Sequence, residues 1–169
     1  MSTVVQEPTI ASPSKLLTAK MAPSRDQLMK TALAVVDAHN SLDVDTMGAI
    51  CSPSFRQRTA PRPVKAPDRN KQEYLEFLKT VLPTFHSFRM RLTEGLSPVI
   101  DEVARKVVLY VNANAEADAG SYANEYILTL TMNEDGTLLE DEVDWIDSAT
   151  MLGWLDKLGQ FAQDTWGKK

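Results

Sequence analysis

The spacing of the apolar residues changes near Phe88, from a helical repeat to the alternation typical of β-strands. Before this point, apolar side chains recur every three or four residues. This predicts helices over about Arg25–Ser41 and Lys71–Leu82, with a shorter helix between them that ends at Cys51. After it, apolar and polar residues alternate along most of the chain, so the second half is predicted to be a sheet. Helices followed by strands indicate an α+β domain.

The alternating half divides into four predicted strands at turn-like stretches, of which Asn133-Glu134-Asp135-Gly136 is the clearest. We expect these strands to pair antiparallel in sequence order. A short strand, Phe55–Thr59, lies among the helices, and Asp147 with Ser148 can cap a closing helix. The helices would then cover one concave face of a curved sheet and enclose a pocket. The predicted strands of the sheet are residues 87–97, 105–116, 121–132 and 137–146.

The chain has 169 residues, which is about one domain. Residues 1–22 mix Ser, Thr and Pro with scattered apolar side chains and lack a helical or strand period, so they are predicted to form a flexible leader. Residues 23–169 are predicted to form the single domain.

Composition argues against several classes of protein. Eighteen Lys and Arg against 23 Asp and Glu give a net charge of -5, which disfavours nucleic-acid binding. No apolar run approaches the length of a membrane span or a secretory signal, so we expect a cytoplasmic protein with no membrane partner. One cysteine and two histidines do not suffice for a disulfide or the usual structural zinc site. With no nucleotide fingerprint either, we expect no metal and no cofactor.

Tyr122, Asn124 and Tyr126 are spaced by two, so they share one face of a predicted strand. Two phenols and an amide can donate hydrogen bonds to a substrate carbonyl or enolate. The alternative is that both tyrosines pack at the sheet surface with their hydroxyls in solvent.

Glu142, Asp144 and Ile146 share one face of the last predicted strand. A carboxylate in a buried strand is costly unless it is paired, hydrated or used, and desolvation would raise the pKa of Asp144 toward the working pH. Asp144 is therefore our candidate general acid/base. The acidic run Glu140-Asp141-Glu142 favours the alternative, a solvated strand face.

Further polar residues are candidates for substrate binding. Gln57 alternates with Thr59 at the expected pocket mouth, although ordinary strand surface has the same pattern. His39, on the inner face of its helix, could shuttle protons or be a buried, satisfied histidine. Cys51 fits a pocket wall or core thiol better than a nucleophile. Asp147 could be a helix cap, a second active-site carboxylate, or both.

The stretches RDQLMKTALAVVDAHN, SYANEYILTLTMNEDG and DEVDWIDS resemble the small SnoaL-like isomerases and cyclases of fungal meroterpenoid and alkaloid pathways. The resemblance implies a nuclear-transport-factor-2-like cone, with active-site tyrosines at Tyr122 and Tyr126 and a catalytic acid at position 144. The relatives usually have Glu-Phe-Val-Asp-Ser where this chain has Asp-Trp-Ile-Asp-Ser from Asp144 onward. They also tend to have an arginine at the position of Cys51, so a mechanism that needs that guanidinium cannot simply be carried over.

The resemblance implies a cofactor-independent isomerase or cyclase acting on a polycyclic polyketide, terpenoid or alkaloid intermediate. Isomerisation, cyclisation, rearrangement and lactone hydrolysis all remain open, and a hydrolase or dehydratase of the same fold is the runner-up. The alternative from another class is a non-catalytic dimeric module that binds a small molecule or peptide. We expect a homodimer through the outer sheet face, because Val108 and Tyr110 make that face partly apolar too.

Overall fold

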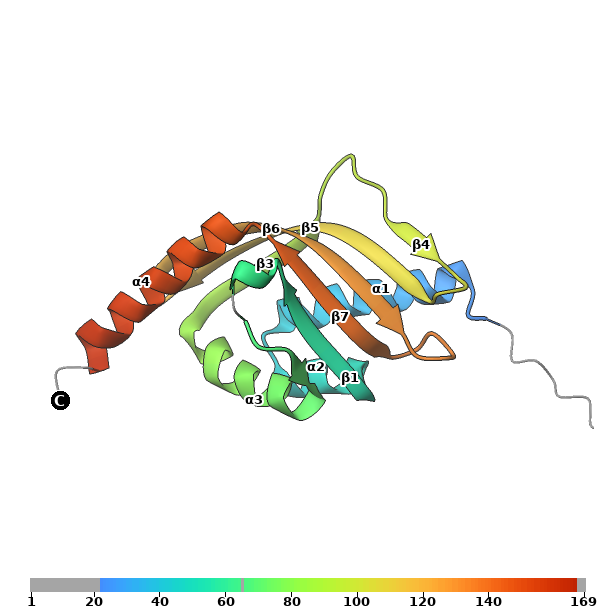
Figure 1. Ribbon diagram of the computed structural model, residues 1–169, viewed down its shortest axis with the longest axis horizontal. Helices are drawn as coiled ribbons and strands as arrows, with labels where there is room; N and C mark the ends of the chain where they lie inside the picture. The colour runs from blue at the N-terminus through green and yellow to red at the C-terminus, as the bar shows by residue number, and fades with distance from the viewer. Residues whose placement is uncertain (1–21, 65, 167–169) are drawn as a thin grey trace, which may run out of the picture.

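The computed structural model describes residues 22–64 and 66–166, which form a curved sheet with helices in its hollow (Figure 1). The expected leader falls outside the described residues except for Ala22. Within the described ranges, no helix is both long and apolar enough to cross a membrane. In chain order the elements are α1 (Arg25–Ser41), α2 (Val44–Ile50), β1 (Cys51–Ala60), η1 (Arg62–Val64), β2 (Arg69–Asn70), α3 (Lys71–Val81), η2 (Leu82–Thr84), β3 (Phe85–Leu92), β4 (Val99–Asp101), β5 (Lys106–Ala117), β6 (Gly120–Met132), β7 (Leu139–Ile146) and α4 (Ser148–Trp166).

The strands form a mixed sheet in the order β2-β1-β7-β6-β5-β3, with β4 paired to β5. The antiparallel pairing expected for the long strands is confirmed for β3 with β5, β5 with β6, and β6 with β7. β1 runs parallel to β7 and pairs Thr59 with Asp144 in register. This parallel pair joins the first half of the chain to the last strand, and it places β1 beside the candidate acid.

Several predicted boundaries are wrong. The second helix ends at Ile50, and β1 begins directly at Cys51, so the short strand expected at Phe55–Thr59 is twice as long. Pro53 lies in the stretch where the register between β1 and β7 shifts. Because the two strands do not pair regularly there, the backbone N–H that proline lacks removes no hydrogen bond between them. The first strand of the predicted sheet ends at Leu92 instead of residue 97, and β4 follows the turn at Gly95.

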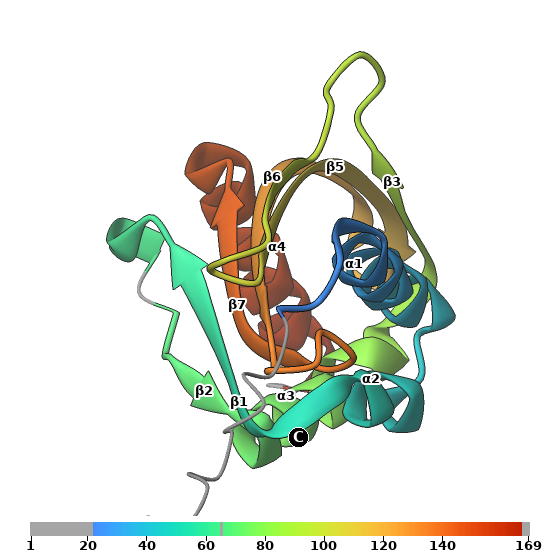
Figure 2. The ribbon, with the colours of Figure 1, turned by 90° about the vertical axis from the view of Figure 1, so that its right-hand side faces the viewer.

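Helix α1 lies in the hollow of the curved sheet (Figure 2). Its apolar face buries Leu28 and Val35 in the main core, as the helical repeat predicts. The start of the helix packs on the turn between β6 and β7, where Thr31 Oγ1 donates to the Gly136 carbonyl at 2.5 Å. A Cβ on Gly136 would lie 2.6 Å from Pro23 Cβ, and its φ of 75° also favours glycine, so the close approach requires that residue.

Helices α3 and α4 complete the walls around the concave face. Asn70 and Glu73 form a full capping box at the start of α3. Helix α4 leaves the sheet after β7 and extends past its end (Figure 1), and Trp154 packs against Tyr122 with ring centroids 5.2 Å apart. The predicted fold class, an α+β cone with helices on the concave face, is confirmed.

Candidate active site

A cavity of about 490 Å³ lies between the helices and the concave face of the sheet. Its walls are mostly aliphatic and aromatic side chains from all four helices and from β1, β3, β6 and β7. Among the described residues, no three His, Cys, Asp or Glu side chains stand close enough to hold a metal ion. The polar side chains on the cavity lining are His39, Gln57, Thr59, Arg69, Tyr74, Tyr122, Tyr126 and Asp144.

The two tyrosines of β6 meet in the cavity wall, as their spacing predicts. Their hydroxyl oxygens are 2.6 Å apart, and Asn124 Nδ2 donates to the Tyr122 hydroxyl at 2.8 Å. Burial raises the pKa of both phenols, so both are neutral and each carries one proton. One of these protons is used in the bond between the hydroxyls, which leaves the other for a ligand oxygen. The pair is therefore a hydrogen-bond donor aimed into an apolar cavity.

Asp144 reaches the same cavity from β7. Gln57 Nε2 donates to its Oδ2 at 2.8 Å, while no N–H or hydroxyl donor of the described residues reaches its buried Oδ1. Burial raises the pKa of Asp144 to about 6, although the bond from Gln57 and the nearby charge of Arg69 act in the opposite direction. A carboxyl group that titrates in this range can both take up and release a proton near neutral pH.

Glu142, two residues before Asp144, is the most deeply buried carboxyl group at the site, with an exposed fraction of 0 %. The alternative that the acidic run favoured, a solvated strand face, is wrong for this residue, because β7 turns Glu142 into the core beside Asp144. Burial and the neighbouring Asp144 carboxyl raise its pKa well above the ordinary value. The carboxyl groups of Glu142 and Asp144 are within hydrogen-bonding range of each other.

His39 lies on the cavity lining and contacts Glu142 from α1, with 3.5 Å between its Nε2 and Glu142 Oε1. Its Nδ1 is 3.3 Å from the carbonyl oxygen of Val35, one turn earlier in the helix. Burial lowers the pKa of His39 to about 4, so the imidazole is neutral at physiological pH.

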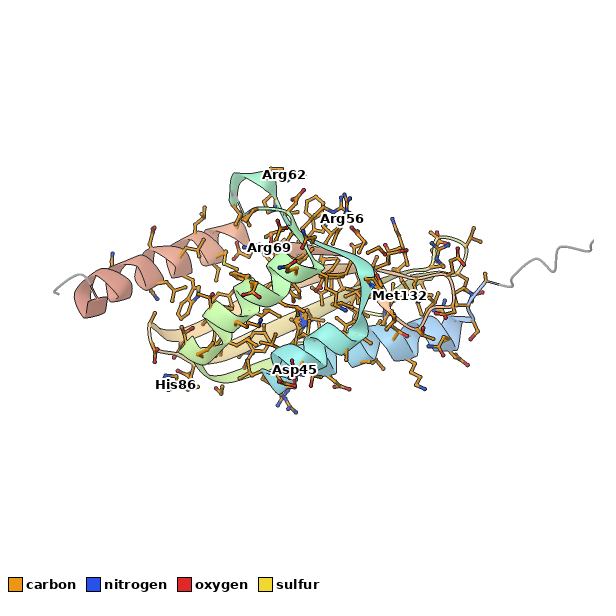
Figure 3. The ribbon with its side chains drawn as sticks, turned by 90° about the horizontal axis from the view of Figure 1, so that it is seen from below. Asp45, Arg56, Arg62, Arg69, His86 and Met132 are labelled. Atoms are coloured by element: carbon orange, nitrogen blue, oxygen red, sulfur yellow. The ribbon has the colours of Figure 1, made fainter. Side chains whose placement is uncertain are left out.

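Arg69 brings a guanidinium group to the cavity wall where β2 joins α3 (Figure 3), and on its outer side it borders a small polar pocket that Arg56 of β1 also lines. Its Nη1 donates to Gln57 Oε1 at 3.1 Å, and its Cζ lies 4.0 Å from the ring centroid of Phe77. No carboxylate of the described chain lies within ion-pair distance of it. Arg69 thus provides positive charge near Asp144 and fixes the orientation of the Gln57 amide.

Three residues predicted to bind substrate lie off the cavity lining. Asn124 lies behind the cavity wall, where its amide nitrogen donates to the Tyr122 hydroxyl and, at 3.3 Å, to the Asp147 carbonyl. Cys51 is buried in the apolar core as the first residue of β1, and burial raises the pKa of its thiol to about 12. The exposed Asp147 caps α4 by accepting from the Thr150 hydroxyl and from Ala149 N, and these two bonds lower the pKa of its carboxyl group.

Sequence reasoning missed three polar residues of the site, Arg69, Tyr74 and Glu142. Arg69 follows a proline-rich loop, and no local pattern connects it to the cavity. The sequence does contain a signal for Glu142, since this residue stands two positions from Asp144 on the same strand face. Its acidic neighbours, however, favoured the interpretation of a solvated surface.

No protein-family model matches the sequence. Austinoid biosynthesis clusters protein H of Penicillium brasilianum is 37% identical over 150 residues, which cover 88% of this chain and 94% of the relative. The crystal structure of BvnE pinacolase from Penicillium brevicompactum has a TM-score of 0.79 at 33% identity, covering 82% of this chain and 98% of that one. A SnoaL-like protein from Shewanella denitrificans has a TM-score of 0.65 at 15% identity, covering 78% of this chain and 98% of that one, and this likeness concerns the fold alone.

Proposed function

This chain belongs to the SnoaL-like enzymes of fungal secondary metabolism that include austinoid cluster protein H, and we propose that its cavity rearranges a polycyclic intermediate by acid/base catalysis. The predicted class, an isomerase or cyclase of secondary-metabolite biosynthesis, is confirmed by these relatives.

The position of Asp144 is the observation that carries the mechanism. Its carboxyl group faces an apolar cavity, Gln57 fixes its orientation, and burial brings its pKa to about 6. Near neutral pH the ionised carboxylate removes a proton from the substrate, and the resulting acid can return that proton at another atom. One side chain then performs both the deprotonation and the reprotonation of an isomerisation or ring closure.

Negative charge that develops on a substrate oxygen would be stabilised by donors already in place. The Tyr122 and Tyr126 pair offers one free hydroxyl proton. Arg69 has five N–H donors, of which the described residues engage Nη1 through Gln57 and the Pro67 carbonyl. Because the cavity wall is largely apolar, these hydrogen bonds are stronger than in water and need no rearrangement during the reaction.

The size and polarity of the cavity support a rigid, mainly hydrocarbon substrate. A volume of about 490 Å³ is within the range of roughly 300–1,000 Å³ found for sites that hold drug-sized ligands. Aromatic side chains such as Phe88 and Trp154 form much of the wall. A polycyclic terpenoid, alkaloid or polyketide with a few oxygen groups fits this arrangement.

We also propose that the enzyme is a homodimer. On the outer face of the sheet, Ile127 and Trp145 are direct partners across β6 and β7, and their exposed fractions are 41% and 51%. Tyr110 is the partner of Ile127 on β5 and is half-buried, like Val108 on the same face. A second copy of this chain would cover this apolar row, which otherwise faces water.

Incubation of the enzyme with polycyclic pathway intermediates, followed by mass and NMR analysis, tests the proposed function. We expect a product of unchanged mass and altered skeleton. A product heavier by one water would identify a hydrolase instead, and consumption that requires an added cofactor would contradict cofactor independence.

A further inference from the structure

Glu142 is a buried carboxyl group that the mechanism above does not use. Both of its oxygens are shielded from solvent, and no N–H or hydroxyl donor of the described residues reaches either of them. It lies behind the cavity lining, next to Asp144, and so does not touch a ligand directly. A buried carboxylate without donors or a counter-ion is strongly unfavourable, so the protonation state of Glu142 needs an explanation.

The contact with His39 indicates where the proton is. His39 Nδ1 faces the Val35 carbonyl, which can only accept, so Nδ1 carries the hydrogen of the neutral ring. Nε2 then presents a lone pair to Glu142 Oε1. A lone pair and an ionised carboxylate would repel each other, whereas a carboxylic acid can donate to that nitrogen. This geometry favours a proton on Glu142 unless the imidazole is charged, and burial opposes that charge.

The other neighbours of Glu142 do not favour its ionised form. Tyr74 from α3 and Cys51 from β1 are buried and neutral, because burial raises the pKa of both. On β7 itself, the Asp141 carboxyl group pairs with Arg58 at 2.6 Å. Within the described chain, no Lys or Arg lies within ion-pair distance of Glu142, so nothing offsets a negative charge there.

Asp144 is the acceptor that this proton can serve. Its Oδ2 already accepts from Gln57, while its buried Oδ1 has no N–H or hydroxyl donor within the described chain. A carboxylic acid beside a carboxylate forms a strong charge-assisted hydrogen bond. A single proton on Glu142 therefore removes the repulsion between the two carboxyl groups, and it can be donated either to Asp144 Oδ1 or to His39 Nε2.

We propose that Glu142 is a positioning residue that stays a neutral carboxylic acid and donates a hydrogen bond to Asp144, keeping that carboxylate ionised and correctly oriented in the cavity. The inference rests on the proposed role of Asp144 as the base. When Asp144 takes a proton from the substrate, the Glu142 hydroxyl turns to His39 Nε2 as its alternative acceptor. One proton has then moved from substrate to Asp144, and Glu142 has kept its own.

Infrared difference spectroscopy of the substrate-free enzyme tests the state of Glu142 independently of turnover. At about pH 8, where Asp144 is ionised, we expect the wild type to show the carbonyl stretch of a protonated carboxylic acid. This band should be absent from Glu142→Gln and unchanged in the control Glu125→Gln, which alters an exposed carboxyl group on β6. A wild-type spectrum without the band, or a band that persists in Glu142→Gln, would overturn the proposal.

The pH dependence of kcat/KM tests the effect on Asp144. A glutamine keeps a neutral donor, so Glu142→Gln should leave the acid limb within a few tenths of a pH unit of the wild type. Glu142→Leu removes the donor, which should raise the pKa of Asp144 and move the acid limb to higher pH. At pH values below the limb, kcat/KM should then fall by about tenfold for each pH unit by which the limb has moved. If Glu142 were ionised, Glu142→Gln would remove a repelling charge and move the limb to lower pH, contrary to our expectation.

Discussion

Gln57 Nε2 and Asp144 Oδ2 are joined by a 2.8 Å hydrogen bond that crosses the parallel pair of β1 and β7. Arg69 donates to the oxygen of the same amide, so its nitrogen is held toward Asp144. The candidate base is therefore oriented by a residue from the first half of the chain, and its basicity depends on that contact.

Replacement of Gln57 by leucine should weaken the base at acidic pH. Loss of a donor to the ionised carboxylate raises the pKa of Asp144, which already lies at about 6 because of burial. The acid limb of kcat/KM should move up by about one pH unit. Thr59→Val, which leaves the Gln57 bond to Asp144 in place, is the control. An acid limb that does not move would show that Gln57 has no influence on the base.

Asp144 should also make stability depend on pH. Its pKa in the folded protein, about 6, is above the ordinary value of 3.8, so the folded state holds a proton that the unfolded state has released. Stability from this group therefore falls as pH rises between these values. Asp144→Asn should be more stable than the wild type at about pH 8 by on the order of 1–3 kcal/mol, and nearly equal to it at about pH 4. Urea unfolding at both pH values measures this, and a variant less stable at the higher pH contradicts it.

The two tyrosines of the cavity wall should act as one unit. Tyr122→Phe and Tyr126→Phe each break the bond between the hydroxyls and should raise the activation free energy by about 1–3 kcal/mol. The double variant should raise the activation free energy by clearly less than the sum of the two single effects, because both single changes disrupt the same donor pair. A double-mutant cycle on kcat/KM measures the coupling, and strict additivity would show that the hydroxyls act separately.

The proposed dimer can be tested on the outer face of the sheet. Trp145→Glu places a charge in the exposed apolar row and should shift the mass in solution from dimer to monomer while leaving the cavity intact. Sedimentation at micromolar concentration measures this. Leu152→Glu, an equally apolar exposed position on α4, serves as the control. A wild-type protein that is strictly monomeric under these conditions contradicts the proposal.

Local patterns predicted the parts of the structure that depend on local physics. The bounds of α1 match the prediction, and those of α3 match to one residue, because Ser24 and Asn70 cap the two helices directly before their apolar helical repeats. The shared face of Tyr122 and Tyr126 follows from the period of a strand alone. These residues could be assigned to one strand face without knowledge of the rest of the fold, whereas their place in the cavity wall could not.

Contacts between distant segments were not predictable in this way. The parallel pairing of β1 with β7 brings Gln57 to Asp144, and no local signal marks it. The alternatives for Cys51 and Asp147 stayed open because each stands at an element boundary, where a shift of one residue turns a side chain from the cavity to the core or to solvent. The burial of Glu142 could not be predicted without knowing that α1 lies over this part of the sheet.

Asp144→Asn gives the most direct test of the account, because it keeps the shape of the side chain and removes its ability to accept a proton. Asp144→Glu is the companion variant, since it retains the carboxyl group at a different reach and should keep part of the activity. Turnover of Asp144→Asn under saturating substrate at neutral pH should fall by roughly 100-fold to 10,000-fold, with the fold and ligand binding preserved. Turnover close to that of the wild type would contradict the assignment of Asp144 as the group that moves the proton.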